Sequence, residues 1–93
     1  MTDDLAERIK KAAQVFVAAG AREVYLFGSA ANGTMREDSD IDFATRGLPD
    51  EFFFRTIARA ADVLQCPLDL VELSDDSAFT RYLEEEKELV RVA

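Results

Sequence analysis

The chain has 93 residues, 48% of them hydrophobic and 32% charged, which predicts one small globular domain over residues 1–93 and excludes a disordered chain. The net charge of −8 argues against direct nucleic-acid binding, which needs lysine and arginine to neutralise phosphates, and favours a basic protein partner. No segment approaches the roughly 20 apolar residues that span a bilayer, and the acidic start is unlike a signal peptide. We therefore expect no membrane association and a cytoplasmic location.

The N-terminal half predicts one helix followed by two strands. Asp4 and Glu7 form a capping-box pattern, and apolar residues recur at helical spacing behind them, which predicts a helix over about 5–19. β-branched and aromatic residues predict a strand at 23–28, and a second strand is expected at 40–45.

The C-terminal half continues with a helix, a strand and another helix. Pro49-Asp50 opens a helix with apolar residues at helical spacing, which ends before Pro67. A strand is expected at about 68–73, and a last helix would have Phe79 and Leu83 on its inner face. The segment 89–92 forms either a short strand or a frayed end.

Three consecutive phenylalanines, Phe52-Phe53-Phe54, begin the second helix. Because consecutive helical residues point around most of the circumference, they cannot all be buried. We expect Phe53 to belong to the core and Phe52 to be the most exposed of the three.

The pair Gly28-Ser29 directly follows the first strand. Glycine lets the backbone approach a ligand without a Cβ in the way. A short helical turn beginning at Ser29 would leave backbone amides free to bind phosphate oxygens. The pair is therefore a candidate nucleotide-binding turn.

Ten residues later the chain reads Asp40-Ile41-Asp42. Residues two apart on a strand project to the same face, so Asp40 and Asp42 would present their carboxylates together. Carboxylate oxygens are the ligands that Mg²⁺ selects, and Mg²⁺ completes its shell with water and substrate phosphate. We expect these two residues to bind metal and to act in catalysis.

A third carboxylate is needed if two metal ions are to hold the attacking and leaving oxygens about 3.5–4 Å apart. Asp69 is the candidate, because it is the lone acid near the start of the third strand, which is otherwise apolar there. Glu72 falls on the opposite face of that strand by alternation and is the poorer ligand.

This arrangement resembles the minimal nucleotidyltransferases of the DNA polymerase beta superfamily. The resemblance covers nearly the whole chain and rests on three features in order: Gly28-Ser29, Asp40-Ile41-Asp42 after ten intervening residues, and Asp69. It implies an α/β (α+β) nucleotidyltransferase fold, with a small mixed β-sheet, helices packed on one face and the active site on the other.

The loop after the Gly-Ser pair departs from the family pattern. Members commonly carry an arginine directly after the pair, where this chain has Ala30. Arg36, in the same loop, could supply the missing charge, so it is the candidate third nucleotide-binding residue beside Gly28 and Ser29.

The resemblance also implies a partner and a reaction. Free-standing members of this size are typically MntA-like antitoxins of HEPN/MNT toxin–antitoxin modules, which transfer AMP from ATP to a tyrosine hydroxyl of a helical HEPN-type toxin. By similarity, this chain would be a protein adenylyltransferase with ATP as substrate and two Mg²⁺ ions as cofactors.

Two other functions remain open. The chain could be a noncatalytic antitoxin that binds its HEPN partner and blocks it sterically; the three aspartates argue against this and Ala30 argues weakly for it. A small-molecule nucleotidyltransferase would need a second domain for its acceptor pocket. Because Val71 and Leu73 would share the open face of the sheet with Asp69, we also expect a partner or a second copy to cover that apolar surface in a homo- or hetero-oligomer.

Overall fold

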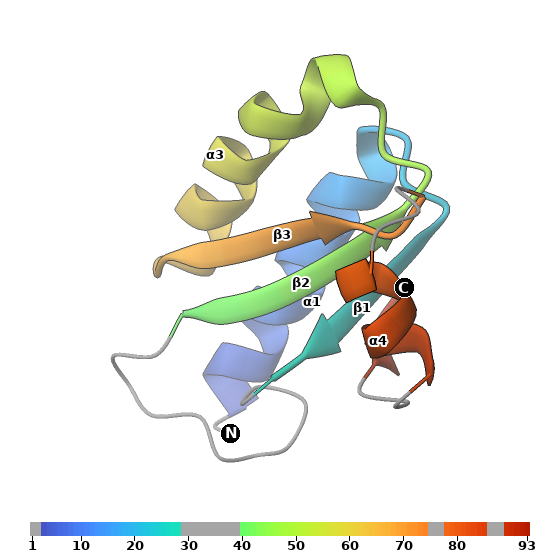
Figure 1. Cartoon of the computed structure of the whole chain (residues 1–93). Coiled ribbons are helices and arrows are strands. Elements are labelled where there is room, and N and C mark those ends of the chain that lie inside the picture. Colours follow the sequence, from blue (N-terminus) through green and yellow to red (C-terminus); the bar gives the residue numbers. More distant parts are fainter. Residues whose placement is uncertain (1–2, 29–39, 75–77, 86–88) are drawn as a thin grey trace.

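Four strands in the order β3-β2-β1-β4 form the sheet at the centre of the protein (Figure 1). The computed structural model describes residues 3–28, 40–74, 78–85 and 89–93. The elements are α1 (Asp3–Ala18), β1 (Glu23–Phe27), β2 (Ile41–Arg46), the 3₁₀ helix η1 (Asp50–Phe52), α3 (Phe53–Leu64), β3 (Leu68–Glu72), α4 (Ala78–Glu85) and β4 (Val90–Arg91).

The sheet is mixed, as predicted. β1 pairs antiparallel with both β2 and β4, whereas β2 pairs parallel with β3. The C-terminal segment, for which both a strand and a frayed end were considered, forms β4. Its pairing with β1 is extended by hydrogen bonds between Val24 and the last two residues, Val92 and Ala93.

The core lies between the sheet and the helices α1 and α3. Val24 and Leu26 alternate with less buried residues along β1, so one face of the strand points into this core. Ile41 and Phe43 of β2 point into the same core, and the centre of the Phe43 ring lies 5.2 Å from that of Phe16 on α1. The predicted amphipathic first helix is confirmed.

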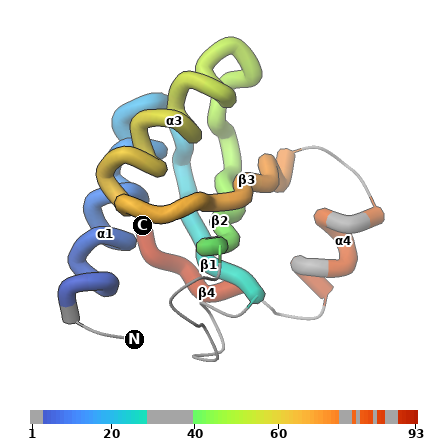
Figure 2. Tube along the Cα trace, turned by 90° about the vertical axis from the view of Figure 1, so that its left-hand side faces the viewer, coloured from blue at the N-terminus to red at the C-terminus, as the bar shows by residue number. Residues whose placement is uncertain are grey.

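The fourth helix is not in this layer. α1 and α3 lie together on one side of the sheet and α4 lies on the other (Figure 2). On that other side Ala44 and Leu73 are fully or almost fully buried, with Tyr25, Phe27 and Leu89 packed against them.

The expectation that this apolar surface needs an external cover is therefore wrong for Leu73, because the C-terminal part of the chain returns over the sheet. The side chains of Phe79 and Leu83, the predicted inner face of α4, lie outside the described residues.

The phenylalanine prediction is partly wrong. Phe53 packs against the core as expected, but Phe54 is 82% exposed and Phe52 only 38%. The prediction was based on one continuous α-helix from Pro49 onward. In the structure Phe52 ends the 3₁₀ helix η1, which has three residues per turn, so its side chain does not follow the spacing of α3.

No helix in the described ranges is long and apolar enough to cross a membrane.

Candidate functional site

Gly28 follows β1 and has a backbone conformation that favours glycine. Its φ angle is +67°, in the left-handed region. A Cβ built on Gly28 would lie only 2.5 Å from Oδ2 of Asp42, closer than side-chain atoms approach one another. The glycine therefore lets the end of β1 come directly against the Asp42 carboxylate, the kind of close backbone approach that the sequence suggested.

Asp42 and Asp69 are brought together by the parallel pairing of β2 and β3. They are direct partners in the strand register, so their side chains project from the same face of the sheet. Ile41 and Phe43, on either side of Asp42, point into the core on the other face. The two carboxyl groups lie within hydrogen-bonding reach of each other.

The environment of Asp42 disfavours its charged form. Partial burial raises the pKa of its carboxyl group, and the charges of Asp69 and Asp40 and the hydrogen bond with Asp69 raise it further. Asp40 lies just before β2 and is exposed. Both Asp40 and Asp69 therefore act on the charge of Asp42.

Such a cluster suits a hard divalent cation. Within the described ranges, no group of three or more His, Cys, Asp or Glu side chains is arranged to hold a metal ion by itself. Mg²⁺, however, usually takes only one or two protein carboxylates and draws its other ligands from water and substrate phosphates. The close pair Asp42 and Asp69, with Asp40 beside it, is a donor set of this type, and a cation would relieve the repulsion between the carboxylates.

Two of the predicted nucleotide-binding residues, Ser29 and Arg36, lie outside the described residues, as does Ala30. The described part of the candidate site thus consists of Gly28 at the end of β1, Asp40 and Asp42 at the start of β2, and Asp69 on β3.

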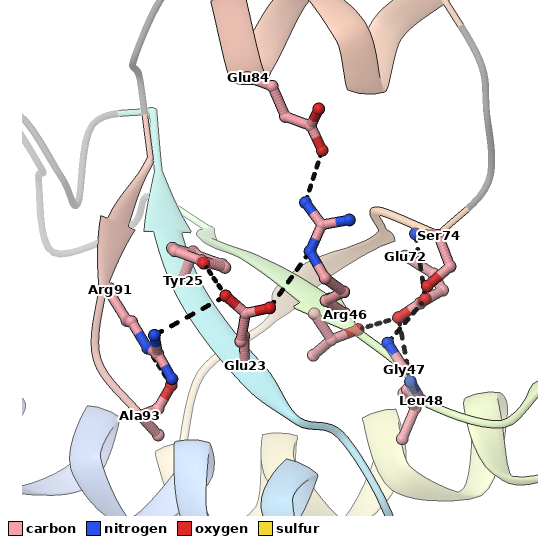
Figure 3. Close-up of polar contacts among 11 residues, drawn as sticks. Glu23, Tyr25, Arg46, Gly47, Leu48, Glu72, Ser74, Glu84, Arg91 and Ala93 are labelled. Carbon is pink, nitrogen blue, oxygen red and sulfur yellow. Dashed lines mark hydrogen bonds and ion pairs between the residues drawn. The ribbon is translucent and has the colours of Figure 1, made fainter.

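Glu72 is buried and, as alternation along β3 predicted, lies on the opposite face of the sheet from Asp69. Its polar contacts are drawn in Figure 3. It accepts hydrogen bonds from the Thr45 hydroxyl at 2.9 Å and from the backbone amides of Gly47, Leu48 and Ser74. Burial alone would raise the pKa of Glu72, but these hydrogen bonds outweigh it and the pKa is lowered. Glu72 therefore anchors the turn after β2 to the end of β3.

Charged residues of β1, β2, α4 and β4 form a cluster on the same face of the sheet as Asp42 (Figure 3). This cluster was not predicted from the sequence. Arg46 bonds Glu84 of α4 at 2.6 Å and Glu23 of β1 at 3.3 Å. Tyr25 donates a hydrogen bond to Glu23, which raises the pKa of the tyrosine. Glu23 and Arg46 are register partners on β1 and β2, a pairing that the sequence alone does not specify. These contacts tie α4 to the sheet.

Several solved structures share this fold. A structure assigned to the minimal nucleotidyltransferases superimposes with a TM-score of 0.77 at 24% identity, covering 95% of this chain and 92% of the other. A toxin–antitoxin structure with AMP-PNP gives 0.75 at 23% identity, covering 92% and 72%. A complex of a tri-AMPylated HEPN toxin with an MNT antitoxin from Shewanella oneidensis gives 0.70 at 19% identity, covering 96% and 71%.

No curated protein matches the chain at a significant level. The profile of the family described as "Polymerase beta, Nucleotidyltransferase", in contrast, matches residues 7–91, which is nearly all of the sequence. The match spans both the glycine at the end of β1 and the three aspartates. The chain therefore belongs to the polymerase beta nucleotidyltransferase family.

Proposed function

We propose that this protein is a Mg²⁺-dependent nucleotidyltransferase that transfers AMP from ATP to a hydroxyl group of a HEPN-type toxin and so acts as its antitoxin, with tyrosine as the expected acceptor. The observation that carries the proposal is the contact between Gly28 and Asp42, whose carboxylate is paired with that of Asp69. Gly28, which the sequence assigns to a phosphate-binding turn, thus lies directly beside carboxylates that suit a metal ion.

The similar structures support the choice of partner and nucleotide. One is a toxin–antitoxin with AMP-PNP, and another contains a HEPN toxin that carries three AMP groups beside its MNT antitoxin. The matching chains of these two structures are 23% and 19% identical to this one, so the nucleotide and the AMP groups support the proposal by analogy of fold.

The proposed reaction is an in-line displacement at the α-phosphorus of ATP. The acceptor oxygen forms a bond to phosphorus, the bond to pyrophosphate breaks, and the hydroxyl proton passes to Asp69. Bound Mg²⁺ supplies charge neutralisation on the triphosphate and lowers the pKa of the acceptor hydroxyl. Asp40 and Asp42 would hold the metal and the turn at Gly28 would hold the phosphates. The chain contains no histidine, so it cannot itself supply a histidine base.

Asp69→Asn separates this enzyme from an antitoxin that only blocks its partner. Because Asp40 and Asp42 remain to hold metal and triphosphate, we expect ATP affinity to change by no more than about threefold, while AMP transfer falls by at least about 100-fold. Asp62→Asn, an exposed aspartate on α3, is the matched control and should leave both unchanged.

The experiment measures transfer of label from α-³²P-ATP to the partner, together with growth of cells that express the partner. Loss of transfer and of growth rescue in the same variant supports the enzyme. Full rescue by Asp69→Asn without transfer would contradict it and establish steric blocking.

A further inference from the structure

A groove of about 450 Å³ runs between α1 and α3 on the side of the protein away from the candidate site. It is lined by Lys11, Gln14, Val15, Ala18, Ala19, Phe52, Arg55, Thr56 and Arg59. None of these residues belongs to a strand. The groove therefore belongs to the layer of α1 and α3, which lies on one side of the sheet (Figure 2). Asp42 and Asp69 project from the opposite face of the sheet.

The groove is positively charged in a strongly acidic protein. Lys11, Arg55 and Arg59 line it, and no acidic side chain of the described residues does. The chain as a whole carries 19 acidic residues against 11 basic ones, so this local excess of positive charge runs against the composition.

The three cations of the groove differ from other basic residues in their contacts. Arg8 is already engaged with Asp4, and Arg46 with Glu23 and Glu84. Lys11, Arg55 and Arg59, by contrast, have no ion pair with any residue in the described ranges. Their charges are therefore available to an external anion.

Between the cations the groove is mainly apolar. Val15 of α1 and Ala19, directly after the helix, are partly buried, and Phe52, at the end of η1, remains 38% exposed. A ligand that matches both features needs apolar side chains along one stripe and negative charge on its flanks. An amphipathic helix with acidic residues beside its apolar stripe has this chemistry.

Nucleic acid fits the groove less well. Its affinity depends on neutralising many phosphates, and the three cations of the groove provide few such contacts. Phe52 is the single aromatic residue that lines the groove, so bases would find few stacking partners there.

We propose that the groove between α1 and α3 is a docking site for an acidic amphipathic helix of a partner protein. A partner helix bound there lies on the opposite side of the sheet from Gly28 and Asp42, so docking and nucleotidyl transfer use separate surfaces. The proposal does not depend on which acceptor the candidate active site modifies.

The test is an NMR titration of the full ¹⁵N-labelled chain with a synthetic peptide. The probe is a helical peptide of about 18 residues, or five turns, with leucines along one stripe and glutamates on both flanks. We expect amide shifts concentrated at the groove, including Val15, Ala18 and Thr56, and weaker binding at higher ionic strength. Replacing the glutamates of the peptide by lysines should abolish these shifts.

The variant Arg55→Glu/Arg59→Glu should weaken peptide binding by about tenfold or more, because it removes two attractions and adds repulsion. Position 55 lies in the first turn of α3, where the helix dipole favours the negative charge that the variant introduces, so the fold should survive. The control is Lys10→Glu, on α1 but outside the groove. It also replaces a positive by a negative charge, and it should leave peptide binding unchanged.

Three results would overturn the proposal. They are absence of peptide shifts at the groove, equal binding of the glutamate and lysine peptides, and preferential binding of a single-stranded RNA oligonucleotide at the same residues. Thermal melting of each variant checks that a loss of binding is not a loss of fold.

Discussion

Gly28 is the residue whose identity the structure explains most directly. In Gly28→Ala the new Cβ would meet the Asp42 carboxylate, and φ of +67° would be strained for any L-residue other than glycine. We expect a loss of about 1–2 kcal/mol in the free energy of unfolding from the backbone term alone. The contact with Asp42 should add to this loss, as measured by urea unfolding.

A double-mutant cycle isolates that contact. If the Asp42 side chain is the obstacle, Gly28→Ala should cost less by about 1 kcal/mol in the Asp42→Ala background than in the natural protein. Gly20→Ala, at another glycine with positive φ but beside Pro49, is the control and should cost the same in both backgrounds. Equal costs of Gly28→Ala would show that the two residues do not touch.

Asp42 combines a stability cost with a proposed catalytic role. Asp42→Asn should reduce AMP transfer by about 10³-fold, because the proposed metal site loses a ligand. The melting temperature should hold or rise, since burial and two neighbouring carboxylates disfavour the charge that the variant removes.

A thermal-shift assay distinguishes the two effects. Mg²⁺ with ATP should raise the melting temperature of the natural protein and raise that of Asp42→Asn much less. Near-normal transfer by this variant would contradict the metal assignment.

At the scale of elements, Glu72 joins the end of β3 to the turn that follows β2. Glu72→Gln removes the charge that accepts hydrogen bonds from Thr45 and three backbone amides, so we expect a loss of about 1–3 kcal/mol at pH 7. Glu51→Gln, at an exposed position in η1, should have little effect.

The pH dependence of this difference has a defined sign. The pKa of Glu72 is lowered in the folded protein, so its stabilising contribution is present above the unfolded value, about 4.3, and is lost as the pH falls through the folded value. The gap between the natural protein and Glu72→Gln in urea unfolding should therefore shrink in acid. A gap that stays constant or widens would show that the charge is not what matters.

Sequence patterns predicted most elements because the relevant signals are local. The helical spacing of apolar residues in α1 and the alternation of apolar residues on β1 identify structure without knowledge of the rest of the chain. The predicted capping box is wrong as the start of α1, because the helix begins at Asp3 and already contains Asp4. The side on which α4 packs is not local: it depends on contacts such as Arg46 with Glu84, 38 residues apart. The short 3₁₀ helix before α3, which redirects Phe52, likewise has no distinct periodicity in the sequence.

The candidate site was predictable for a related reason. Spacing and strand alternation were enough to place Asp42 and Asp69 on one face, and the parallel register then sets them side by side. The raised pKa of Asp42 and the contact with Gly28 depend on packing between strands, which the sequence does not specify. The groove between α1 and α3 was not predictable from the sequence, because its cations come from two helices that lie more than 40 residues apart in the chain.

At the scale of the whole molecule, the sheet separates the candidate active site on one face from the groove of α1 and α3 on the other. The face with Gly28, Asp42 and Asp69 also supports α4, which is tied to it by Arg46. The other face is covered by α1 and α3, which form the basic groove on their outer side. In our proposals, the groove would hold a partner helix while the acceptor hydroxyl reaches the face with Asp42 and Asp69.

The most direct test of the central claim is the intact mass of the HEPN-type partner after co-expression with this chain. The account predicts additions of the mass of AMP on the partner with the natural chain, and none with Asp42→Asn at matched expression. Substitution of the modified tyrosine by phenylalanine should then remove the addition. An unmodified partner that is nevertheless inactive in the presence of the natural chain would contradict the account.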